Sequence, residues 1–128
     1  MKQSWVLDAS ALLAAIQNEP SGDFVKQNIE QSVISSINWS EVLQKIAQTD
    51  MNAAHIETML LGLGLTVIDF TAEDACLAAF LWPEGKKLGL SLADRACLAT
   101  AKRLKVPVVT ADKAWKKIDC GLKVILIR

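Results

Sequence analysis

The stretch SWVLDASALLAAI, residues 4–16, joins a short apolar run to a helical pattern, with a single acidic residue between them. The apolar run ends at Asp8. Leu12, Leu13 and Ile16 then recur at helical spacing until the residues EPSG at 19–22 interrupt the pattern. We interpret the stretch as a strand followed directly by a helix, which is the beginning of an α/β arrangement.

The same alternation continues along the chain. Apolar runs predict further strands at residues 33–37, 65–70, 106–110 and 124–127. One helix is predicted to begin after Asn38 as its N-cap, and another to span 71–82, where Pro83 should end it. Further helices are predicted at 23–31, 52–61 and 92–104, with a short helical segment at 113–117. Residues 84–89 are expected to form a loop. Because the strands are continuously apolar, we expect a three-layer α/β/α domain with a mainly parallel sheet of about five strands.

Size and composition favour one folded domain spanning residues 1–128. Hydrophobic residues make up 52% of the chain and charged residues 22%, which suits a compact core. No apolar run approaches the roughly 20 residues of a membrane span, and Asp8 lies where a signal peptide would be apolar, so a cytoplasmic protein is expected. The cysteines and tryptophans are expected to be core residues; they are Cys76, Cys97 and Cys120, and Trp5, Trp39, Trp82 and Trp115.

The net charge of zero hides an uneven distribution. Residues 1–84 carry three basic and eleven acidic side chains, a balance of −8, whereas residues 85–128 carry eleven basic and three acidic ones, a balance of +8. This asymmetry suggests a surface that binds a polyanion or a self-complementary assembly surface. Interleaving of the two halves on folding would instead average the charges.

Four acidic residues are expected at one edge of the sheet. Asp8 closes the first strand and Asp112 follows the fourth, while Glu41 and Asp94 lie near the beginnings of helices expected at Asn38 and Ser91. In a parallel α/β sheet, strand ends and helix beginnings share the carboxyl edge, where ligands commonly bind. The four carboxylates should therefore meet in one pocket.

Clustered carboxylates require a cation. At about 4 Å and an effective dielectric near 20, two of them repel by about 4 kcal/mol. Oxygen ligands without a nearby histidine or thiolate favour one or two Mg²⁺ or Mn²⁺ ions, which serve phosphodiester hydrolysis. The single histidine, His55, argues against cleavage by a histidine pair.

Each acidic residue also has a purely structural interpretation. The segments 38–41 (NWSE) and 91–94 (SLAD) match the capping box, in which the acid at the fourth position accepts hydrogen bonds from backbone amides. Asp8 and Asp112 could be turn residues at strand ends. Asp119 could be a fifth acid of the pocket, although a loop position is the simpler interpretation.

Four segments together resemble a known family. Their order and spacing resemble the PIN domain, particularly the VapC-type toxins of toxin-antitoxin pairs, over essentially the whole chain; they are residues 6–12 (VLDASAL), Glu41, residues 91–95 (SLADR) and residues 109–115 (VTADKAW). The resemblance implies a metal-dependent ribonuclease. Asp8, Glu41, Asp94 and Asp112 would bind metal and activate water, and Ser10 and Thr110 would orient the carboxylates.

The resemblance also implies partners. A homodimer, an RNA substrate and a VapB-like antitoxin that covers the acidic pocket are expected. Arg95 and Lys113 each directly follow a candidate metal ligand, so we expect them, with Lys116, to hold RNA phosphates at the mouth of the pocket.

Three other functions are compatible with the predicted fold but fit its residues less well. A phosphotransfer receiver domain would need a second acid beside Asp8, and a haloacid-dehalogenase-like phosphatase would need an acid where Ser10 stands. A PIN-like module that binds without catalysis remains the main alternative.

Overall fold

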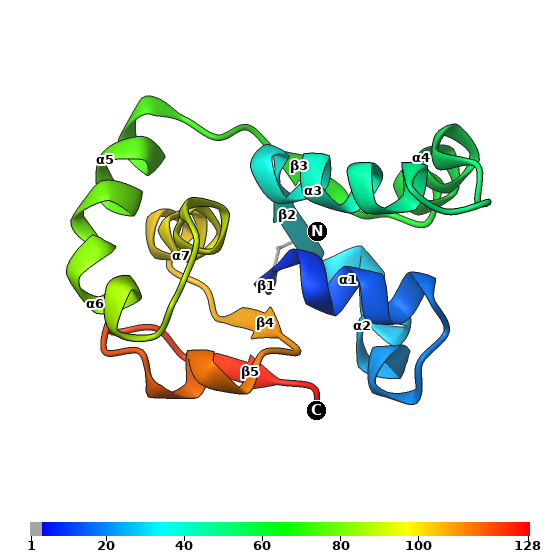
Figure 1. Ribbon diagram of the computed structural model, residues 1–128. Helices are drawn as coiled ribbons and strands as arrows, with labels where there is room; N and C mark the ends of the chain where they lie inside the picture. Colours follow the sequence, from blue (N-terminus) through cyan, green and yellow to red (C-terminus); the bar gives the residue numbers. More distant parts are fainter. Residues whose placement is uncertain (1–3) are drawn as a thin grey trace.

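The computed structural model describes residues 4–128, which fold around a five-stranded parallel sheet (Figure 1). The strands are β1 (Trp5–Leu7), β2 (Ser32–Ser35), β3 (Thr66–Ile68), β4 (Val108–Thr110) and β5 (Val124–Leu126). Their order across the sheet is β3-β2-β1-β4-β5, with every neighbouring pair parallel. The sheet therefore extends outward from β1 in both directions.

Helices cover both faces of this sheet. On one side lie α1 (Ala9–Ile16), α2 (Asp23–Gln27), α3 (Ser36–Ala47) and α4 (Ala53–Gly62), and on the other lie α5 (Ala72–Phe80), α6 (Trp82–Lys87) and α7 (Leu92–Leu104) (Figure 1). Short 3₁₀ turns are found at Pro20–Gly22, Ile29–Gln31 and Lys113–Lys117. The predicted three-layer α/β/α fold with a parallel five-stranded sheet is confirmed.

Successive residues of the central strands pack into two separate hydrophobic cores, one on each face of the sheet. Leu7, Ile34 and Val109 pack against the α1–α4 side, whereas their neighbours Val6, Val33 and Val108 pack against the α7 side. All six are fully buried. Because successive strand residues point to opposite faces, a sheet covered on both sides needs continuously apolar strands, as the sequence predicted.

The predicted beginning of α3 was wrong. The helix begins at Ser36, and its N-cap is Ser35, whose hydroxyl accepts a hydrogen bond from the amide of Ile37 (3.2 Å). Asn38 therefore lies inside the helix, and Glu41 is in the second turn rather than in a capping box. A serine at the end of β2 caps as well as asparagine does, so the earlier residue begins the helix.

The predictions around Pro83 were also wrong. Pro83 does not end a helix but lies in the first turn of α6, where a missing backbone N–H is tolerated. Most of the expected loop at residues 84–89 is consequently helical. The predicted second helix is shorter than expected, since α2 ends at Gln27 and a 3₁₀ turn follows.

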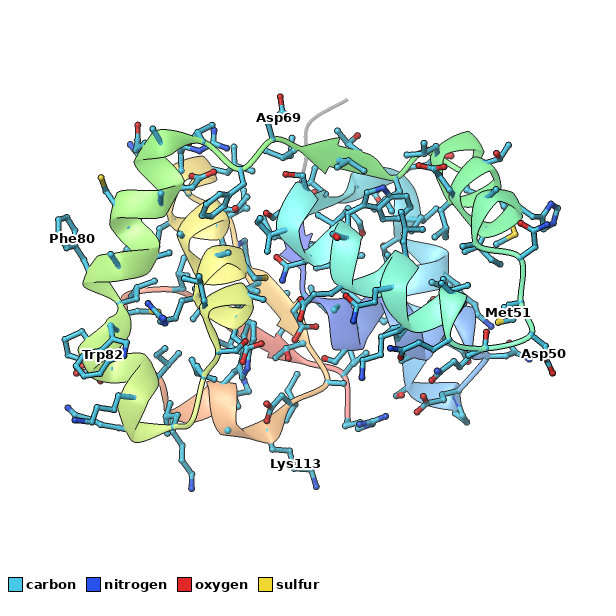
Figure 2. The ribbon with its side chains drawn as sticks, turned by 45° about the horizontal axis from the view of Figure 1, so that its top comes forward. Asp50, Met51, Asp69, Phe80, Trp82 and Lys113 are labelled. Carbon is cyan, nitrogen blue, oxygen red and sulfur yellow. The ribbon has the colours of Figure 1, made fainter. Side chains whose placement is uncertain are left out.

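Some predicted core residues lie at the surface. Trp115 and Trp39 are buried, but Trp82 is 51% exposed and projects outward from α6, as Figure 2 shows. Cys97 is buried, whereas Cys76 is exposed, and all three cysteines are free thiols. Of the helices described in residues 4–128, none is long and apolar enough to cross a membrane.

Candidate functional site

Asp8 lies at the carboxyl end of β1 and is the N-cap of α1. Its Oδ1 accepts a hydrogen bond from the amide of Ala11 (2.8 Å), and its Oδ2 accepts one from the hydroxyl of Thr110 (2.6 Å). The hydroxyl of Ser10 lies 2.8 and 2.9 Å from the two carboxylate oxygens. With 4% of its surface exposed, Asp8 is held in one orientation by three neighbours.

The two hydroxyls that hold Asp8 also fix the segment after β4. Ser10 Oγ accepts a hydrogen bond from the amide of Ala111, and Thr110 Oγ1 accepts one from the amide of Asp112, both at 3.0 Å. Ser10 and Thr110 therefore join the carboxyl ends of β1 and β4. This arrangement is what an orienting role for the two residues requires.

The environment of Asp8 disfavours its charge. Burial raises the pKa of its carboxyl to about 6, and the nearby charge of Asp94 adds to the rise, while hydrogen bonds from Thr110, Ala11 and Ser10 oppose it. A cation bound beside Asp8 would favour the charged form of its carboxyl and so oppose the effect of burial.

Glu41 projects from the second turn of α3, and its partner is Asn38. The Nδ2 of Asn38 donates hydrogen bonds to Glu41 Oε1 (2.9 Å) and to the carbonyl oxygen of Ala93 (3.0 Å). Asn38 is 1% exposed, and its Oδ1 has no hydrogen-bond partner among the described residues. The sequence does not predict this contact, because its local pattern favours Asn38 as a helix cap.

Asp94 has the structural role that its sequence motif predicted. Its Oδ2 accepts a hydrogen bond from the amide of Ser91 (2.9 Å), and the Ser91 hydroxyl accepts one from the amide of Asp94 (3.1 Å). This capping box occupies one carboxylate oxygen. Within residues 4–128, Asp94 Oδ1 makes no hydrogen bond and is available to a ligand.

Asp112 is the most exposed of the four acids. It caps the 3₁₀ turn after β4, with Oδ1 accepting a hydrogen bond from the amide of Ala114 (2.9 Å). It lines an open hollow of about 500 Å³ together with Ser10, Lys113 and Arg128. Its link to Asp8 runs through Thr110, which bonds the Asp8 carboxylate and the Asp112 amide.

Three of the acids act on one buried group. Burial raises the pKa of the Cys97 thiol, and the charges of Asp8, Asp94 and Glu41 raise it further. The three carboxylates therefore all lie near this thiol in the first half of α7. No three Asp, Glu, His or Cys side chains within residues 4–128 are already grouped closely enough to hold a metal ion.

The donor set nevertheless suits a divalent cation. It offers the carboxylate oxygens of Asp8, Glu41 and Asp94, and Asn38, whose oxygen is unpaired in the described part of the chain, contacts Glu41. The Cys97 thiol is buried and hydrogen-bonded to the carbonyl of Leu7. Oxygen donors of this kind fit Mg²⁺ or Mn²⁺. Metal binding would bring the carboxylates closer together, since they are not yet grouped around one point.

The expected RNA-binding residues differ in their surroundings. Lys113 is exposed and projects from the edge of the molecule after β4 (Figure 2). Arg95 instead donates from Nη1 to the carbonyl of Ala78 (2.7 Å) and packs beside Gly85, and Lys116 donates to the carbonyl of Val124 (2.9 Å). RNA binding by Arg95 and Lys116 stays a prediction, although both cations already have protein partners.

Comparison with protein families identifies the fold. The PIN domain model matches residues 5–120, which includes all four acids and the side chains that contact them. The chain belongs to the PIN domain family. No functionally curated protein matches this PIN domain in sequence.

Solved structures agree with this assignment. The DNA-bound VapBC complex of Salmonella typhimurium contains a chain that superposes with a TM-score of 0.78 at 16% identity, covering 98% of this chain and 99% of that one. FitAcB of Neisseria gonorrhoeae gives 0.73 at 21% identity (95% and 96% covered). VapC20 of Mycobacterium tuberculosis, described as a sarcin-ricin loop cleaving toxin, gives 0.69 at 12% identity (91% and 97% covered). At these identities the likeness establishes the fold alone.

Proposed function

We propose that this PIN domain is an Mg²⁺- or Mn²⁺-dependent endoribonuclease and the toxin of a VapBC-type toxin-antitoxin pair. The observation that carries the proposal is the fixed, buried Asp8 carboxylate with Glu41 and Asp94 around the same region. A bound metal ion would offset the mutual repulsion of these charges, which accounts for several carboxylates near one another.

Each residue has a distinct task in this proposal. Asp8, Glu41, Asp94 and Asp112 would hold one or two ions, which when bound would lower the pKa of water and polarise the phosphodiester. Ser10 and Thr110 keep the Asp8 oxygens in place through bonds of 2.6–2.9 Å. The capping box fixes Asp94 at the beginning of α7, so that its position does not depend on the metal.

The proposal includes two protein partners. A VapB-like antitoxin would inhibit the enzyme, and an arginine from it would pair with the clustered carboxylates. An apolar hollow of about 390 Å³ between α1 and α4, lined by Ile16, Met59 and Leu63, offers further contact area. The expected homodimer could use Ile37 and Leu92, which are exposed and line a small apolar hollow at the beginnings of α3 and α7. The protein would act on RNA in the cytoplasm.

Cleavage of RNA by the purified protein tests the proposal. Asp8→Asn, Glu41→Gln, Asp94→Asn and Asp112→Asn should each lower Mg²⁺-dependent cleavage by roughly a hundredfold or more, because a misplaced ion cannot activate water. Asp50→Asn is the matched control, since Asp50 is exposed and projects from the loop between α3 and α4 (Figure 2).

Two results would contradict the proposal. Near wild-type cleavage in three of the four variants would show that the site lies elsewhere. RNA binding by a wild-type protein that cleaves no RNA with either metal would instead favour a PIN domain that binds without catalysis.

A further inference from the structure

Asn38 connects two acids that come from different elements. It belongs to α3, three residues before Glu41, and its second acceptor, Ala93, directly precedes Asp94 in α7. Both partners are acceptors, a carboxylate oxygen and a carbonyl oxygen, so the amide must present its nitrogen to them. Its two N–H groups are thereby used, and the orientation of its oxygen is fixed as well.

The amide group is the only hydrogen-bond partner that the described residues give to the Glu41 carboxylate. Glu41 is half-buried and has three rotatable side-chain bonds, so without Asn38 its carboxylate could adopt several orientations. The bond to Ala93 also ties α3 to the first turn of α7. Asn38 therefore fixes both the direction of Glu41 and its spacing from Asp94.

The oxygen of Asn38 is the unusual feature of this contact. It is buried and has no partner in residues 4–128, so no hydrogen bond compensates for the loss of its contact with water. An apolar side chain of similar size would avoid that cost, so packing alone does not account for an amide here. An acceptor buried in an amide that contacts the Glu41 carboxylate is suited to a donor that arrives with a ligand, and a hydrated divalent cation carries such donors.

We infer that Asn38 is a positioning residue for the metal site, which orients Glu41 toward the ion and holds it in register with Asp94. The inference rests on the proposed metal-dependent function and adds to it a residue outside the four acids. Because Asn38 itself carries no charge, its effect must come through geometry and hydrogen bonding.

Binding of Mn²⁺ to the metal-free protein, followed by electron paramagnetic resonance, tests this role without measuring activity. Asn38→Leu, which removes the donors and keeps the size, should weaken Mn²⁺ binding by about 10- to 100-fold. Asn38→Ser, which keeps one donor, should give a smaller loss. Thr100→Val is the matched control, because the Thr100 hydroxyl is buried in α7 and, among the residues that the structure describes, bonds only to the carbonyl of Ala96 in its own helix.

A second measurement examines the contact itself in the absence of metal. By NMR, the side-chain amide protons of Asn38 should exchange slowly with solvent, and their shifts should change in Glu41→Gln. Fast exchange would overturn the inference, as would Asn38→Leu binding Mn²⁺ as tightly as wild type. A wild-type protein that binds no Mn²⁺ would refute the proposed function and the metal part of this inference together. Loss of Mn²⁺ binding in Asn38→Leu, with Thr100→Val unaffected, would support both.

Discussion

Asp8 is under two opposing influences, and their balance has a measurable consequence. Burial disfavours its charge, whereas Thr110, Ala11 and Ser10 donate hydrogen bonds that favour it, and burial prevails. The pKa in the folded protein, about 6, is higher than the 3.8 of an unperturbed Asp. The folded state therefore holds a proton that the unfolded chain has already released between about pH 4 and 6, and folding is weakened as the pH rises through this range.

From this we predict that Asp8→Asn stabilises the metal-free protein at pH 7.5. The gain should be on the order of 1–3 kcal/mol, since two pKa units correspond to about 2.7 kcal/mol and the amide loses some hydrogen bonds. At pH 4.5 the difference should largely disappear, because wild-type Asp8 is then protonated when folded. Urea unfolding in EDTA at both pH values measures it. An equal difference between the two proteins at both pH values would show that Asp8 ionises normally.

At the scale of single residues, the local contacts of the acids were easier to predict from the sequence than the long-range ones. The segment SLAD predicts the capping box of Asp94, because the hydrogen bonds involved are local and depend on residue spacing alone. The contact between Asn38 and Ala93 spans 55 positions and depends on how α3 packs against α7. No local pattern encodes such a contact, so Asn38 was placed at a helix end instead.

Among the helices, α5 and α7 are joined by a buried ion pair. Arg103 Nε lies 2.6 Å from Asp74 Oδ1 and its Nη2 lies 3.2 Å from Oδ2, with the Asp74 side chain fully buried and that of Arg103 23% exposed. Asp74 also completes the capping box of α5 with Thr71. Burial alone would raise the pKa of Asp74, but Arg103 and the Thr71 amide outweigh it and hold the pKa below its usual range.

Removal of this carboxylate should destabilise the fold strongly. Asp74→Ala leaves the Arg103 guanidinium without its carboxylate partner and removes half of the capping box of α5. We expect a loss of about 2–4 kcal/mol, somewhat below the full cost for a completely buried pair because Arg103 reaches solvent. Thermal unfolding at pH 7 measures the loss. Glu73→Ala, which removes an exposed acid from the same turn, should change the stability by less than about 0.5 kcal/mol. Similar melting temperatures for the two variants would contradict a stabilising ion pair.

Element boundaries were predictable where one residue decides them. Thr71 and Ser91 begin α5 and α7 as expected, since each is followed at the right distance by an acid. The start of α3 was missed because three polar residues, Ser35, Ser36 and Asn38, compete for the cap. Pro83 was misplaced because proline is compatible with both the end of one helix and the first turn of the next, and here the two helices are nearly continuous.

For the molecule as a whole, the alternation of strands and helices was enough to predict the three layers. The order β3-β2-β1-β4-β5 was not predicted, because it depends on which strands pair across long distances in the chain. That order places β1 at the centre with β4 beside it, and so brings Asp8 and Thr110 together although they are 102 positions apart. The shared edge of the acids follows from parallel topology, but their actual contacts follow from this strand order.

The uneven charge of the chain leads to a prediction about RNA. Lys113 is exposed beside the hollow lined by Ser10 and Asp112, near the acids, whereas Lys105 lines a separate hollow with Pro107 and Lys123, where β4 begins. The acids repel the phosphates of RNA, and a cation beside them can hold those phosphates, so Lys113 should contribute to binding and Lys105 should not. Each phosphate neutralised on a single strand changes the slope of log K against log salt by about 0.7.

Binding of single-stranded RNA in Ca²⁺, measured over a salt series, checks this prediction. Wild type should show a slope of about −2 to −3, corresponding to three or four phosphates, and Lys113→Ala should reduce its magnitude by about 0.7 and weaken binding at low salt. Lys105→Ala is the matched control, with the same charge change at the other end of the strands. If Lys105→Ala weakens binding as much as Lys113→Ala does, RNA is attracted by the total positive charge of residues 85–128 and not by a surface beside the acids.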